Sequence, residues 1–158
     1  MTTTAPLLVR PAEGQHVWHL GSMMRFIATG DQTEGHFWLA DVTAPQGSSA
    51  PLHRHTREDE TFMVADGELT VRVDDRTLKL GPGDIAYAPR HLPHDWRATS
   101  QQARFFVLGT PAGFEGYFFE TGIPLPGPSA LPPPGLEDEI PARTTLEAAL
   151  VKYGCEFL

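Results

Sequence analysis

Glycine and proline limit this chain more than any other feature of its sequence. The 158 residues include 15 glycines and 15 prolines, so a residue that disfavours regular helix occurs about every five positions. Long helices do not fit that density, whereas short strands joined by turns do. We therefore expect an all-β fold in which antiparallel strands form a barrel or sandwich.

The length allows one domain with a hydrophobic core of its own. Segments rich in β-branched and aromatic residues recur between turn signals and predict eight strands, at 23–28, 36–43, 61–65, 69–73, 77–80, 85–88, 95–99 and 104–108. We accordingly expect an N-terminal arm at residues 1–20, a barrel at 21–110 and a C-terminal appendage at 111–158 that packs on the barrel.

Local signals divide this pattern further. Asp66-Gly67 predicts a hairpin turn. Residues 113–120 predict a short aromatic-rich helix, and residues 122–135 hold six prolines and should be irregular. Residues 145–152 show apolar positions at helical spacing, and Gly154 is placed to end that helix.

Charge and composition exclude several classes of partner. The chain has 12 basic and 20 acidic residues and a formal charge of -8, which disfavours nucleic acid and anionic membrane surfaces. Residues 1–10 do not have the pattern of a secretory signal, and no run approaches the roughly 20 apolar residues of a membrane span. We expect a cytoplasmic protein, with its single cysteine, Cys155, as a spectator thiol.

Four residues between Gly47 and Ala98 carry the candidate chemistry. His53 and His55 stand two apart, so a strand would present both imidazoles on one face. Glu60 follows five residues later, and His94 begins another apolar-alternating stretch. Three imidazoles and a carboxylate on inward strand faces are a plausible site for a divalent transition metal.

Each of these residues also has a plainer interpretation. A lone His-x-His pair is more often a surface feature than a ligand pair. Glu58 lies on the same strand face as Glu60 and competes with it as a ligand; spacing favours Glu60, and we expect Glu58 to be a solvated carboxylate. His16, His19 and His36 lie outside the pattern, and we assign them no role.

The complete spacing points to a known family. Gly47, five residues, His53-x-His55, four residues, Glu60, six residues and Gly67 are followed by Gly83, five residues, Pro89, one residue, His91, two residues and His94. These segments resemble the two motifs of the cupin superfamily. The resemblance implies a single-domain β-barrel of the jelly-roll type. The second motif departs twice: His91 stands where the family usually has glycine, and Ala98 stands where it often has asparagine.

The resemblance implies a metal centre with His53, His55, Glu60 and His94 as ligands. It implies one divalent transition metal ion per chain, nickel, cobalt, manganese or iron, with zinc and copper also compatible. It also implies a homodimer, in which edge strands pair and the residue 1–20 arm crosses to a partner.

The C-terminal tail resembles that of the bacterial quercetin 2,3-dioxygenase-like cupins. Four features carry this resemblance: the run from Thr110 to Phe118, then Gly122, then the proline-rich stretch, and finally Tyr153-Gly154. That resemblance implies O2-dependent ring cleavage of a flavonol-like or other enolic aromatic substrate. Glu60 would then be both a metal ligand and a general base. We expect an apolar pocket for the aromatic substrate, lined by Phe37, Phe62, Trp96, Phe114 and Tyr117.

Two other functional classes stay open. The first is a non-oxidative cupin metalloenzyme, an isomerase or a polyketide cyclase, in which Glu60 or His91 moves a proton. The second is a binding module without turnover, against which the converging ligands argue, because buried polar groups without a metal would be left unpaired.

Overall fold

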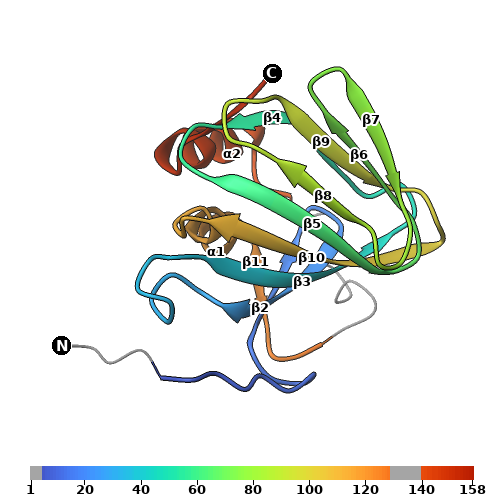
Figure 1. The fold of residues 1–158 in the computed structure, drawn as a ribbon. Coiled ribbons are helices and arrows are strands. Elements are labelled where there is room, and N and C mark those ends of the chain that lie inside the picture. Colours follow the sequence, from blue (N-terminus) through green and yellow to red (C-terminus); the bar gives the residue numbers. More distant parts are fainter. Residues whose placement is uncertain (1–4, 129–139) are drawn as a thin grey trace.

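Two antiparallel β-sheets face each other and enclose the core (Figure 1). The computed structural model describes residues 5–128 and 140–158 of the chain. Within those residues the larger sheet has seven strands and the smaller sheet has five. This architecture confirms the all-β, barrel-type fold that the sequence predicts.

The larger sheet contains, in order across it, β11 (Ile123–Leu125), β1 (Gln15–His19), β2 (Ser22–Ala28), β3 (Trp38–Pro45), β10 (Gln102–Thr110), β5 (Asp59–Asp66) and β8 (Ile85–Ala88). The smaller sheet contains β12 (Cys155–Phe157), β4 (Ser49–His55), β9 (His94–Ala98), β6 (Leu69–Val73) and β7 (Arg76–Leu80). Two helices, α1 (Glu115–Thr121) and α2 (Arg143–Lys152), follow the last long strand, β10.

The chain passes repeatedly from one sheet to the other. From β3 to β10 the only consecutive strands that pair directly are β6 and β7, whose two-residue turn is Asp74-Asp75. Alternate residues on each strand face the interior, as in β5, where Glu60, Phe62 and Val64 are buried and their neighbours are not. The side chains on one face of each sheet therefore form a shared core.

The structure corrects two sequence predictions. Strand β1 belongs to the large sheet, where it pairs with β2 and β11, so the arm predicted at residues 1–20 ends before Gln15. Asp66-Gly67 is not a hairpin turn, because β5 pairs with β10 and β8 whereas β6 lies in the other sheet. The chain turns a corner there, and a Cβ on Gly67 would lie 2.1 Å from the Gln102 carbonyl oxygen.

Residues 111–158, which were predicted only to pack on the barrel, also contribute strands to its sheets. The helices were predicted close to their observed bounds, and Gly154 follows α2 with a φ of 77°, as a helix-ending glycine should. Strands β11 and β12, however, join the edges of the two sheets, and short three-residue strands of this kind carry no alternation signal. The predicted irregular stretch at 122–135 includes β11, and its residues 129–135 lie outside the described part.

No helix in the described ranges is long and apolar enough to cross a membrane.

A close contact on the large sheet links the fold to the candidate site. Gly109 pairs with Trp38 across β10 and β3, and a Cβ on Gly109 would lie 2.0 Å from the indole Nε1 of Trp38. Trp38 is completely buried. Glycine is therefore needed at 109 to leave room for the indole ring.

We predict that Gly109→Ala lowers the free energy of unfolding by about 1–3 kcal/mol, because the added methyl group overpacks a rigid, buried contact. Urea denaturation monitored by circular dichroism measures the change. Gly127→Ala is the matched control, since a Cβ there meets nothing within 4 Å. Equal unfolding midpoints for the Gly109 variant and the wild type would contradict the prediction.

Candidate metal centre

Strands from both sheets bring the four predicted ligands together. His53 and His55 lie on β4, His94 lies opposite His53 on the neighbouring β9, and Glu60 projects from β5 of the other sheet. One ligand atom from each residue lies within 4.8 Å of the others, and all four residues are buried. The structure thus assembles the same four residues that the sequence singles out.

Backbone carbonyls orient two of the imidazoles. The Nδ1 atom of His53 lies 2.7 Å from the Pro51 carbonyl oxygen, and that of His94 lies 3.1 Å from the Leu92 carbonyl oxygen. A carbonyl oxygen only accepts, so each Nδ1 carries the proton and donates it. Nε2 is therefore the atom of each ring that is left to bind a metal, which it does when it carries no proton.

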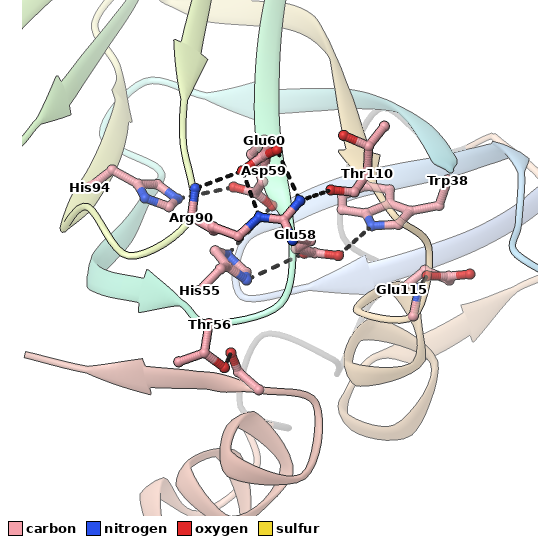
Figure 2. A network of polar contacts seen from close by, with 12 residues as sticks. Trp38, His55, Thr56, Glu58, Asp59, Glu60, Arg90, His94, Thr110 and Glu115 are labelled. Atoms are coloured by element: carbon pink, nitrogen blue, oxygen red, sulfur yellow. Dashed lines mark hydrogen bonds and ion pairs between the residues drawn. The ribbon is translucent and has the colours of Figure 1, made fainter. Parts of the chain in front are cut away.

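A buried carboxyl group stands behind the third imidazole (Figure 2). Oε1 of Glu58 lies 3.3 Å from Nδ1 of His55, and Oε2 accepts a hydrogen bond of 3.2 Å from Nε1 of Trp38. Glu58 is only 4% exposed, so the expectation of a solvated carboxylate is wrong. The alternation of β5, which carries Glu60 inward, indicates the same inward face for Glu58 two residues earlier.

The buried groups shift one another's pKa values. Burial raises the pKa of Glu58 to about 9, with the charge of Glu60 adding to the effect. Burial also opposes ionisation of Glu60, but the imidazoles of His55, His94 and His53 outweigh it and lower its pKa to about 2. Burial lowers the pKa of His53 to about 3. The cluster therefore holds one ionised carboxylate, Glu60, beside a protonated one, Glu58.

His94 titrates differently from His53. Burial by itself would lower its pKa, but the hydrogen bond and the charge of Glu60 outweigh burial and raise it. The two groups are in direct contact, with Nε2 of His94 3.1 Å from Oε2 of Glu60. The carboxylate oxygen only accepts, so this contact needs a proton on Nε2 as well as on Nδ1, and His94 pairs with Glu60 as an imidazolium. A bound metal would take the place of the Nε2 proton.

An ion pair holds the two ligand-bearing segments in register. Asp59 points outward between Glu58 and Glu60, and both of its oxygens accept from the Arg90 guanidinium at 3.0 Å (Figure 2). Its Oδ1 also accepts from the backbone N–H of Arg90 at 2.8 Å. This contact ties the start of β5 to the loop that leads to His94, so the spacing between Glu60 and His94 depends on it.

His91 lies in the same loop but outside the cluster. Its φ of 71° lies in the left-handed region, which explains physically why glycine suits this position. Its backbone N–H donates to the His55 carbonyl oxygen at 2.8 Å, and its side chain is exposed. His91 therefore supports the loop through its backbone, and its imidazole does not line the cavity described below.

The donor set fits a divalent transition metal. Nε2 of His55 is buried and has no hydrogen-bond partner among the described residues. Buried polar atoms of this kind are costly unless something satisfies them. Three imidazole nitrogens and one carboxylate oxygen within coordinating reach of one centre would do so, with His53, His55, Glu60 and His94 as the ligands.

The cluster opens on one side into an apolar cavity. His53 and Glu60 lie on its wall, and so do four of the five predicted pocket residues: Phe62, Trp96, Phe114 and Tyr117. Phe37 is the exception, because β3 begins at Trp38 and it is the Trp38 side chain that faces inward. Leu150 of α2 and Phe157 of β12 complete the wall, so the C-terminal appendage forms part of the site.

Comparison with known families supports the same conclusion. The family model described as "Cupin domain" matches residues 40–109, a range that contains all four ligands. Residues 40–109 are a cupin domain. Its metal cluster and its two-sheet fold are those of a metal-binding cupin.

Individual relatives agree with the family. The cupin is 27% identical over 122 residues to quercetin 2,3-dioxygenase of Bacillus subtilis, a match that covers 77% of this chain and 36% of that enzyme. The chain thus spans about a third of the length of that relative.

Solved structures support the fold. KdgF from Halomonas matches with a TM-score of 0.56 at 22% identity, over 63% of this chain and 86% of that one. A "predicted oxalate decarboxylase" from Thermotoga maritima matches with a TM-score of 0.61 at 18% identity, over 66% of this chain and 99% of that one.

We predict that His94→Ala loses most of its bound metal after dialysis while the barrel stays folded, because one of the four ligands is removed. Elemental analysis gives the metal content, and circular dichroism checks the fold. His36→Ala is the control, since His36 is exposed and distant in sequence from both motifs. Full metal occupancy in the His94 variant would remove this residue from the site.

We predict that Glu58→Gln weakens metal binding by about 10- to 100-fold. With its Nε2 on a metal, His55 carries its proton on Nδ1, and the positive charge of the ion favours the ionised form of Glu58, which then accepts from both His55 and Trp38. A glutamine offers them only one acceptor oxygen. Competition with a chelator measures the affinity, and Glu68→Gln, at an exposed position, is the control. Unchanged affinity would show that Glu58 does not position His55.

Proposed function

We propose that this cupin is a metal-dependent dioxygenase that cleaves a flavonol-like or other enolic aromatic substrate. The observation that carries the proposal is that the four-ligand cluster faces an aromatic-lined cavity through His53 and Glu60. A closed structural metal site would have no such opening. The similarity to the Bacillus subtilis quercetin 2,3-dioxygenase supports the choice of chemistry.

The cavity wall suits a planar aromatic molecule. Phe62 and Trp96 both pack on Phe105 in the interior, and Phe114 contacts the His55 ring edge-on at 4.3 Å between centroids. These rings give a flat ligand apolar contact on several sides and keep water away from the reacting group. Orientation of the substrate and exclusion of water are thus the contributions of the protein's apolar residues.

Glu60 is the residue we assign to proton transfer. It is the ionised carboxylate of the cluster and it lines the cavity, whereas Glu58 is protonated and does not. An enolic hydroxyl bound next to His53 would meet the Glu60 oxygens, which take its proton. A bound metal would supply Lewis-acid and redox chemistry at this position.

We predict that the metal-loaded protein consumes O2 when quercetin is added, with loss of the flavonol absorption band. Glu60→Gln should keep part of its metal and lose at least about 100-fold in turnover, because it keeps the shape of the side chain without the base. An oxygen electrode and a spectrophotometer measure both signals. Asp66→Asn, an exposed change on the same strand, is the control.

Two results would contradict the proposal in different ways. Unchanged turnover in the Glu60 variant would remove the general-base role and leave the dioxygenase class intact. A metal-loaded protein that leaves both O2 and flavonols untouched would overturn the class, and carbonyl isomerisation or cyclisation under anaerobic conditions would be tested next.

A further inference from the structure

The cavity has a second polar end, at the hairpin between β1 and β2. His19 and Ser22 are opposite partners across this hairpin, both are buried, and both line the cavity. The turn between them consists of Leu20 and Gly21, with φ values of 46° and 87°. A leucine in the left-handed region is strained, and this leucine also faces the cavity.

The hydrogen bonds of His19 define its protonation. The Thr121 hydroxyl donates to the Tyr117 carbonyl oxygen at 2.7 Å, so its oxygen must accept from Nε2 of His19 at 3.0 Å. The proton of the ring therefore lies on Nε2, and Nδ1 is an acceptor. Burial lowers the pKa of His19 to about 4, which keeps the imidazole neutral at physiological pH.

Ser22 supplies a hydroxyl group that the described residues do not use. The residue is 4% exposed, and its Oγ has no hydrogen-bond partner in the described part of the chain. A buried polar atom left unpaired is unfavourable for folding. Alanine would occupy the same space without that penalty, so the hydroxyl group points to a role in binding.

The two polar ends are separated by an apolar stretch. The Ser48 hydroxyl donates to the Gly21 carbonyl oxygen at 3.3 Å, which places the hairpin turn beside the start of β4. Ser49 and His53 both line the cavity from β4, and four residues of strand span roughly 13 Å. Among the described lining residues there is no lysine or arginine. The hairpin end can therefore pair with an uncharged group but not neutralise an anion.

We propose that His19 and Ser22 form a recognition site for an uncharged hydroxyl group at the far end of the ligand. The Ser22 hydroxyl donates to the ligand oxygen, and the ligand hydroxyl donates to Nδ1 of His19. The cavity thus selects a flat, largely apolar molecule with one polar group at the ligand cluster and a second at the hairpin. This inference deepens the proposed function and rests on it for the orientation of the ligand.

Three related compounds test the inference: 3-hydroxyflavone and its 4′-hydroxy and 7-hydroxy derivatives, which share one chelating end. Titration of the metal-loaded protein without oxygen, followed by tryptophan fluorescence, gives the affinities. We expect one hydroxylated derivative to bind about 3- to 10-fold more tightly than the parent compound. Ser22→Ala should abolish that advantage and change the affinity for the parent by less than about 2-fold.

Two controls separate binding from folding. Ser48→Ala removes a neighbouring hydroxyl that does not line the cavity, and it should keep the preference for the hydroxylated derivative. Ser22→Ala should have an unchanged or higher melting temperature, because it removes an unpaired buried group. A lower melting temperature would indicate a structural role for Ser22 and would overturn the inference.

The outcomes distinguish this inference from the proposed function. Equal affinities for all three compounds, binding of none of them, or a preference that survives in Ser22→Ala would each overturn the recognition site. A hydroxyl preference that depends on Ser22 in a protein that consumes no O2 would support the recognition site and overturn the dioxygenase proposal alone.

Discussion

Three imidazoles and a carboxylate converge inside this barrel, where water cannot satisfy them. Polar groups in such a place are stable only when each has a partner. The surrounding structure provides those partners one by one: carbonyl oxygens hold His53 and His94, and Glu58 stands behind His55. The remaining lone pairs point to a common centre, and a divalent metal is the partner that this centre fits.

Neighbouring side chains along a strand point alternately into and out of the barrel, and this alternation brings the carboxylate ligand to the centre. Glu58, just before β5, and Glu60 on β5 face inward, while Asp59 between them faces outward to its ion pair with Arg90. These three consecutive acidic residues thus have three different roles. Glu58 contacts the ligand His55, Glu60 is itself a ligand, and Asp59 binds the loop before His94. Gly109 belongs to the same arrangement, because its missing side chain leaves room for the Trp38 ring that bonds Glu58.

The C-terminal segment completes the site that the barrel begins. Phe114, which directly precedes α1, packs against His55, and Tyr117 of α1 packs against His19, so this short segment touches both polar ends of the cavity. Strand β12 pairs with β4 beside the ligands, and Leu150 of α2 closes the wall. A segment that looks peripheral in the sequence is therefore part of the binding cavity.

The sequence by itself determined the fold class and the four ligands, because both depend on local spacing. Glycine and proline density favours strands, and a two-residue step places His53 and His55 on one face. Strand alternation could also have indicated the inward Glu58, but not its partners. Only the tertiary structure decided which side chains meet across the sheets: that Trp38 replaces Phe37 on the cavity wall, that β1 joins the sheet, and that His19 and Ser22 share the cavity with Glu60. These contacts join residues far apart in the chain, and their geometry follows from sheet packing, which no local pattern encodes.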